Sequence, residues 1–311
     1  MVNRVVLDNQ SHRDVRIAAT RPTRENAEVN AVSVIPREFP RLLAHYPIFY
    51  TKNMETGRFE PSALLGFQPQ ENLFFVDGRW DAAYVPLQIQ RQPFSLITRR
   101  AEDSEGKPPT LEVALDLSQT VQSQEGERLF LEDGQPTKFL QGITSMLSAL
   151  VAGAKETYAF TGRLAELDLI EPVQIDIEFV NGSETKLQGL YWIAAAALKT
   201  LPAAQLAELR DREFLEWMYF QMASISQVSE LVARKNRRLS GVTASRLMPT
   251  RSRFAIFSWS AGVPRGGLPP ACSRRVIRGG GTTGFRLRSS NRASSRRLAS
   301  AKVPGRRFAP H

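Results

Sequence analysis

The sequence predicts an α+β protein that carries a separate basic tail. Three observations favour this fold class: short strand-like runs fill the first half, one long amphipathic helix follows, and a hairpin with C-terminal helices completes the body. This order is typical of α+β proteins. We therefore expect short strands in a mixed or antiparallel sheet, packed around a long central helix.

The first half is predicted to consist mainly of short strands. Apolar runs indicate them at residues 15–19, 31–35, 46–50, 63–67, 73–76 and 111–117. Residues 37–45 could form one or two helical turns, although Pro40 limits where they begin. Asp77-Gly78 is a turn signal between two of the runs. Residues 80–94 are amphipathic, but two prolines would break or kink a long helix there.

The second half shows clearer periodicity. Apolar residues recur at helical spacing from Phe139 to about Leu169, which predicts one amphipathic helix. Residues 173–179 alternate between apolar and polar side chains, as a half-buried strand does. Asn181-Gly182 then predicts a type I′ hairpin turn, with the returning strand at 184–193. The spacing of apolar residues over 214–238 predicts a C-terminal helix that ends in a basic cluster.

Charge divides the chain near Ser240. Residues 241–311 hold fourteen Arg, one Lys and no Asp or Glu, a formal charge of +15. The whole chain has 41 basic and 31 acidic residues, so residues 1–240 carry a formal charge of −5. We therefore expect one body over residues 1–240, with a possible internal boundary near 101–110, and a low-complexity tail that is disordered.

The tail admits two interpretations. Its near-exclusive use of Arg, with abundant Ser, Gly and Pro and no carboxylates, is typical of GC-rich DNA read out of frame, which indicates a frameshift product. A genuine basic tail would bind nucleic acid or another anionic surface, and the Arg-Gly-Gly triplets at 265–267 and 278–280 resemble RNA-binding segments. The glycine motif at 279–284 lacks the strand and helix that a dinucleotide site requires.

Composition excludes several kinds of protein for the body. No apolar run reaches the roughly 18–20 residues that span a bilayer, so we expect no membrane span. The N-terminus lacks an apolar segment typical of signal peptides, which indicates the cytoplasm. The only cysteine is Cys272, in the tail, so the body has neither a disulfide nor a cysteine metal site. We expect no cofactor.

Few residues of the body point to catalysis. His12 and Asp14 have the H-x-D spacing of an iron site with two histidines and one carboxylate. His45 is the only other histidine of the body, so an iron site would need these three side chains to converge. A capping or surface role for His12 is the simpler interpretation. The body contains neither the G-x-S-x-G motif nor a P-loop.

A run of short motifs resembles a known family. They are Glu38-Phe39-Pro40, His45-Tyr46-Pro47-Ile48-Phe49, Leu64-Leu65-Gly66-Phe67, Glu71-Asn72-Leu73-Phe74, Asp77-Gly78-Arg79-Trp80, Tyr84-Val85-Pro86 and Pro93-Phe94. In this order they are similar to the SapC family of bacterial proteins. The resemblance covers about residues 5–238 and omits the tail.

The resemblance implies a cellular location but no specific reaction. The family is named after a surface-layer gene cluster, which implies a role linked to the cell envelope or S-layer. Other members occur beside uptake receptors and halogenase-like genes, which implies an enzyme or enzyme-accessory role as the alternative. The family supplies no catalytic residue to transfer to this chain.

Residues 38–94, which are rich in aromatic residues and proline, have two interpretations. In the first, the aromatic side chains form the packed core, where each contributes on the order of 2 kcal/mol. In the second, some of them line a groove for a peptide or a partner protein, because Tyr, Trp and Arg most often anchor interfaces. The candidate groove residues are Tyr46, Trp80, Tyr84, Arg91 and Phe94.

Taken together, the sequence favours a non-catalytic binding or accessory protein with a protein or peptide partner. An enzyme or enzyme-accessory protein associated with iron or oxygenase chemistry is the first alternative, and nucleic-acid binding through the tail is the second. The sequence does not indicate a small-molecule ligand.

Overall fold

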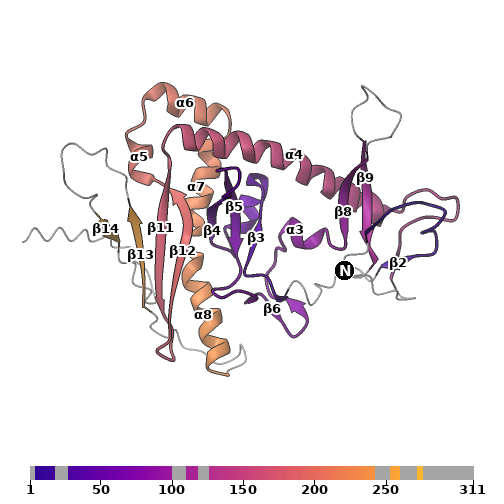
Figure 1. The fold of residues 1–311 in the computed structure, drawn as a ribbon, viewed down its shortest axis with the longest axis horizontal. Coiled ribbons are helices and arrows are strands. Elements are labelled where there is room, and N and C mark those ends of the chain that lie inside the picture. Colours follow the sequence, from indigo (N-terminus) through magenta and orange to yellow (C-terminus); the bar gives the residue numbers. More distant parts are fainter. Residues whose placement is uncertain are drawn as a thin grey trace, which may run out of the picture.

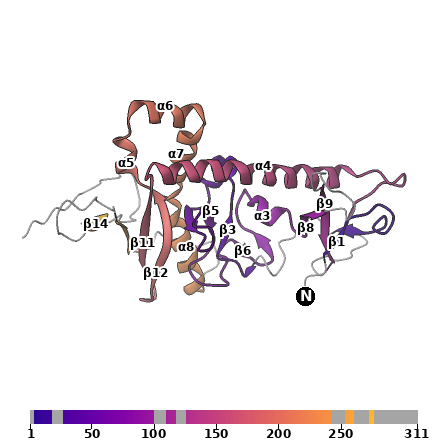
Figure 2. The ribbon, with the colours of Figure 1, turned by 45° about the horizontal axis from the view of Figure 1, so that its top comes forward.

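The computed structural model describes residues 4–17, 27–99, 110–117, 126–241, 253–259 and 272–275. These residues form a larger part around a seven-stranded sheet and a smaller part around a three-stranded sheet. Helix α4 (Lys138–Glu166) runs along both parts (Figures 1 and 2). The predicted α+β class is therefore confirmed.

The larger sheet is antiparallel throughout. In spatial order its strands are β14 (Cys272–Arg275), β13 (Arg253–Trp259), β11 (Ile170–Glu178), β12 (Glu184–Ile193), β4 (Ile48–Lys52), β5 (Phe59–Leu64) and β3 (Ala31–Ser33). Strands β12 and β4 are paired at only two positions, Leu190 with Thr51 and Tyr191 with Tyr50. The sheet therefore needs other contacts to hold its two halves together.

Helix α7 (Phe214–Ser224) supplies those contacts where the strands separate. The Gln221 side chain donates to the carbonyl of Ile48 at 2.8 Å and accepts the N–H of Ile193 at 3.3 Å. The Ser224 hydroxyl accepts the N–H of Ile48 at 3.0 Å. Because unpaired buried backbone groups are costly, these two side chains replace missing ladder hydrogen bonds.

The remaining helices of the described chain are short, apart from α8. They are η1 (Pro36–Glu38), α2 (Phe39–Leu42), α3 (Leu87–Gln90), α5 (Ala195–Lys199), α6 (Ala203–Asp211) and α8 (Gln227–Leu239). Pro86 precedes α3 and limits the amphipathic segment 80–94 to one helical turn, as its prolines predict. Helices α7 and α8 follow one another along the sheet (Figure 1).

The smaller part has its own apolar core. Its sheet has the order β1 (Arg4–Val6), β9 (Thr110–Asp116) and β8 (Phe94–Arg99), and β2 (Arg16–Ile17) pairs with β10 (Glu127–Arg128) nearby. Phe94 and Leu115 are buried in this core against Ile143 and Leu147 of α4. Strands β8 and β9, on either side of residues 100–109, are paired with each other. The proposed boundary at 101–110 therefore falls between two paired strands.

Helix α4 joins the two cores. The hydroxyl of Thr137 caps its first turn by accepting the N–H of Leu140. Leu140 packs in the smaller core and Phe160, about five and a half helical turns further on, in the larger one. Between them Gly153 lies against Ile35, and a Cβ at this glycine would be only 2.4 Å from the Cδ1 of Ile35. A glycine at this position allows the close approach.

The predicted hairpin between β11 and β12 is confirmed, but its turn type was wrong. Gly182 has a φ of +79°, whereas Asn181 does not have a positive φ. A type I′ turn needs positive φ at both residues. The turn therefore spans one residue more, with the Phe179 N–H donating to the Ser183 carbonyl.

The C-terminal helix is divided near residues 225–226 into α7 and α8. Serine hydroxyls on both sides donate to backbone carbonyls: Ser224 to Gln221 at 2.6 Å and Ser226 to Ala223 at 2.9 Å. Such local bonds compete with helical hydrogen bonds. The apolar periodicity alone does not reveal this division.

The tail contributes β13 and β14 to the large sheet. The prediction of a disordered tail, and the motifs at 265–267 and 278–284, otherwise fall on residues outside those that the structure describes. Cys272 begins β14.

Candidate functional site

The site is built on residues 71–86, which we call the aromatic loop. Its tip is the hairpin of β6 (Phe75–Val76) and β7 (Arg79–Trp80). Asp77 and Gly78 have φ values of +49° and +75°, so this two-residue connection has the type I′ signs that the sequence predicted for Asn181-Gly182. The tip is exposed, whereas Trp80 and Tyr84 are half-buried.

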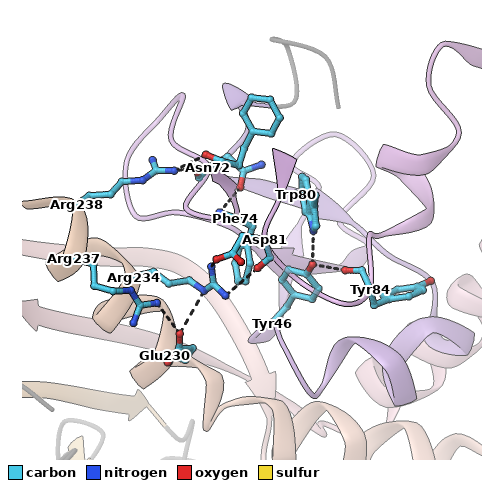
Figure 3. A network of polar contacts seen from close by, with 11 residues as sticks. Tyr46, Asn72, Phe74, Trp80, Asp81, Tyr84, Glu230, Arg234, Arg237 and Arg238 are labelled. Atoms are coloured by element: carbon cyan, nitrogen blue, oxygen red, sulfur yellow. Dashed lines mark hydrogen bonds and ion pairs between the residues drawn. The ribbon is translucent and has the colours of Figure 1, made fainter. Parts of the chain in front are cut away.

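Helix α8 holds the loop through three cations, Arg234, Lys235 and Arg238, of which Figure 3 labels Arg234 and Arg238. Arg234 donates to the Asp81 carboxylate at 2.6 Å and lies 4.4 Å over the ring of Phe74. Arg238 donates to the carbonyls of Asn72 at 2.6 Å and Phe75 at 2.8 Å. The sequence predicted only that this helix ends in a basic cluster, so the role of the cluster as an anchor was missed.

The third cation forms a largely buried ion pair. Lys235 pairs with Glu71, and their side chains are 10% and 12% exposed. The other carboxylate oxygen of Glu71 accepts the N–H of Phe67 at 2.9 Å. Gly66 lies directly against this segment, since a Cβ there would be 2.1 Å from the Glu71 carbonyl oxygen. The start of the loop is therefore fixed from both sides.

Tyr46 connects the middle and the end of the loop. Its hydroxyl accepts the indole N–H of Trp80 at 2.7 Å and donates to the backbone carbonyl of Tyr84 (Figure 3). The ring of Phe74 packs 4.5 Å from that of Tyr46. Burial raises the pKa of the Tyr46 hydroxyl, so it stays protonated and can act as donor and acceptor at once.

A buried carboxylate supports the end of the loop. Glu38, which is 2% exposed, accepts the Tyr84 hydroxyl at 2.9 Å, the Leu87 N–H at 2.8 Å and the Ile35 N–H at 3.1 Å. Burial raises the pKa of Glu38, and its hydrogen bonds oppose that rise. Burial also raises the pKa of Tyr84, and the adjacent Glu38 adds to the effect.

The polar groups of the site already have hydrogen-bond partners within the fold. The Glu38 carboxylate is occupied by three donors, and the Tyr46 hydroxyl by one donor and one acceptor. Polar networks that are fully satisfied in this way make the part of the fold that contains them rigid. The half-buried faces of Trp80 and Tyr84 are what the arrangement presents outward.

The five predicted groove residues fall into two groups. Tyr46, Trp80 and Tyr84 are joined by the contacts above. Phe94 is almost fully buried in the smaller core, and its backbone carbonyl accepts a hydrogen bond from Arg91 at 2.9 Å. Burial lowers the pKa of Arg91. The idea of a partner groove stays a prediction, and Trp80 and Tyr84 are its members with half-buried aromatic faces.

The proposed iron ligands are not assembled into a metal site. His12 contacts Asp8, Asp14 lines a surface cavity with Arg13 and Arg128, and the ring of His45 lies beside that of Tyr46. Within the described ranges, no group of three or more His, Cys, Asp or Glu side chains could hold a metal ion. The iron hypothesis required these residues to converge.

Among the helices of the described residues, none is both long enough and apolar enough to cross a membrane. A family model described as SapC matches residues 7–231, which include the aromatic loop and the start of α8 up to Leu231, but not the cations Arg234, Lys235 and Arg238. No curated protein matches the chain, and no solved structure does.

Proposed function

The chain belongs to the SapC family, and we propose that it is a non-catalytic accessory protein that binds a protein partner through the aromatic loop. We place this role at the cell envelope, with which the name of the family is associated. One observation carries the proposal: the loop is anchored on several sides, yet leaves aromatic faces partly open.

Anchoring matters because binding is opposed by the entropy of ordering flexible groups. The loop is already fixed by α8, by Tyr46 and by Glu38. Little further ordering is then needed when a partner binds. A pre-organised loop of this kind suits recognition better than a loop that must fold on contact.

The open faces have the composition of interface anchors. Trp80 and Tyr84 are half-buried, and the exposed Arg41 lies 5.7 Å over the ring of Tyr84. Tyr, Trp and Arg dominate the energetics of protein interfaces. Together these three side chains form a compact patch that a partner could cover.

Photo-crosslinking in the native host tests the proposal. A photoreactive amino acid would replace Arg79, at the exposed tip of the loop, or Met54, which is 90% exposed and lies between β4 and β5. We expect one dominant crosslinked protein from position 79 that is absent from position 54. Its envelope or cytoplasmic origin would be read from cell fractionation.

The same crosslink should weaken at least tenfold when Trp80 and Tyr84 are both replaced by alanine, provided that the variant keeps its native circular dichroism. Loss of a central anchor typically costs 2 kcal/mol or more in binding. Identical products from positions 79 and 54, or a crosslink indifferent to the double substitution, would refute the proposed surface.

A further inference from the structure

The edge of β11 is a second place where this fold can bind a chain. Residues 7–231, the part matched by the family, contain β11, β12, β4, β5 and β3 of the large sheet. The strand that covers β11, β13 at Arg253–Trp259, lies beyond that match. Within the family part, β11 is therefore the outermost strand on its side.

Strand β11 contains Pro172 and a register shift against β12 between Val173 and Ile175, but the six residues that pair with β13 include neither a proline nor a buried charge. The strand is nine residues long, and Val173, Ile175 and Ile177 are buried against the core. Edges are normally short, or interrupted by proline, bulges or inward-facing charges. Pro172 lies just outside the six residues that pair with β13, so each of those six keeps its N–H. The edge of β11 can therefore pair with a further strand through backbone hydrogen bonds.

In this structure β13 covers the edge. It pairs antiparallel with β11 from Val173 to Glu178, and Ile256 stands opposite Ile175. Ile256 is fully buried and joins the main apolar core. Figure 1 shows β13 at the outer side of β11, away from β12. The added strand thus extends both the hydrogen-bonded ladder and the core.

The charges on β11 favour one orientation of the strand that covers it. On β11, Asp176 and Glu178 belong to a body with a formal charge of −5. Arg253 stands opposite Glu178 in the strand register. An antiparallel strand that begins with a basic residue therefore meets an acidic residue, and cross-strand pairs of opposite charge are favourable.

We propose that the β11 edge binds an extended peptide segment in trans, with an apolar residue opposite Ile175 and a basic residue opposite Glu178. In this chain its own residues 253–259 occupy the site. This mode of recognition is strand addition, in which backbone hydrogen bonds supply affinity and alternate side chains supply specificity. The proposal is independent of the aromatic loop.

The test uses the full chain and a labelled synthetic peptide with the sequence of residues 252–260. Ile256→Asp in the full chain places a charge in the core and should release β13, and Ile256→Ala is a milder second variant. We expect fluorescence anisotropy to show at least tenfold tighter peptide binding by Ile256→Asp than by the unaltered chain. Hydrogen exchange of the β11 amides should rise in the variant and fall when peptide is added, while α7 stays protected.

Two peptide controls separate strand addition from apolar adhesion. Alternate residues of an antiparallel strand direct their N–H groups to the same neighbour. N-methylation of one alternate set should therefore abolish binding, and methylation of the other set should preserve it. Equal loss or equal retention for both sets would overturn the proposal. So would β11 amides that stay protected in both variants, or a released edge that fails to bind the peptide.

Discussion

Replacing Lys235 with methionine tests how strongly α8 holds the aromatic loop. The substitution keeps most of the apolar stem and removes the cation that pairs with Glu71. The Glu71 carboxylate would remain in place, because its other oxygen accepts the N–H of Phe67. It would then be a largely buried charge without its cation.

The expected cost follows from the burial of this pair. The two side chains are 10% and 12% exposed, and removing one partner of a buried pair costs about 3–5 kcal/mol. Because both ends keep some exposure, we expect the lower end, about 3 kcal/mol of the free energy of unfolding. For a domain of this size the same loss lowers Tm by roughly 6–12 °C.

Urea unfolding followed by tryptophan fluorescence gives the free energies. The matched control is Arg237→Met on the same helix, whose pair with Glu230 is 28% and 46% exposed, and which should cost less than about 1 kcal/mol. Adding Glu71→Gln to Lys235→Met should recover about 1–2 kcal/mol, because the unpaired charge disappears. A Lys235→Met variant no less stable than Arg237→Met, or strictly additive losses, would refute the reasoning.

Three further predictions have defined outcomes. Gly153→Ala should lower the free energy of unfolding in urea by about 1–3 kcal/mol, because the new Cβ would meet Ile35 at 2.4 Å. The control is Gly142→Ala, which has open space around it and should be neutral or stabilising by up to about 1 kcal/mol. Equal effects of the two substitutions would contradict the close packing at Gly153. Burial raises the pKa of Glu38, so its contribution to stability is complete below its unfolded pKa of about 4.3 and is lost as pH rises through the folded pKa. The stability difference between the unaltered chain and Glu38→Gln should therefore decline from pH 4 upward, and a difference that grows with pH would be inconsistent with this sign. Tyr46→Phe removes the hydroxyl that accepts an indole N–H, so it should cost about 1–2 kcal/mol, and an unchanged urea midpoint would show that the hydroxyl adds nothing.

Local patterns predicted much of the secondary structure. Helix α4, strand β9 and both strands of the β11–β12 hairpin lie close to where periodicity placed them. These elements are long or strongly alternating, and such signals depend on the chain's own geometry. Strand β5 begins four residues before the expected run at 63–67, because its first residues pair with β4 rather than follow an apolar pattern.

The site itself was only partly predictable. The motifs in residues 38–94 singled out Tyr46, Trp80 and Tyr84, which the structure does join. Composition could not assign Phe94 to the smaller core, because buried and interfacial aromatics share the same sequence signature. Glu38 was part of a motif, but no sequence pattern indicates that three donors converge on its carboxylate.

The residues alone were enough to predict the α+β class, the family and the division into an acidic body and a basic tail. Which charges and amides meet depends on how the elements pack in three dimensions. Lys235 lies 164 residues from Glu71, and Gln221 lies 173 residues from the Ile48 carbonyl that it binds. Periodicity states which face of a helix is buried, but not what that face will touch. Those partners are chosen when distant segments pack, because a buried polar group must find its hydrogen bond wherever the fold provides one.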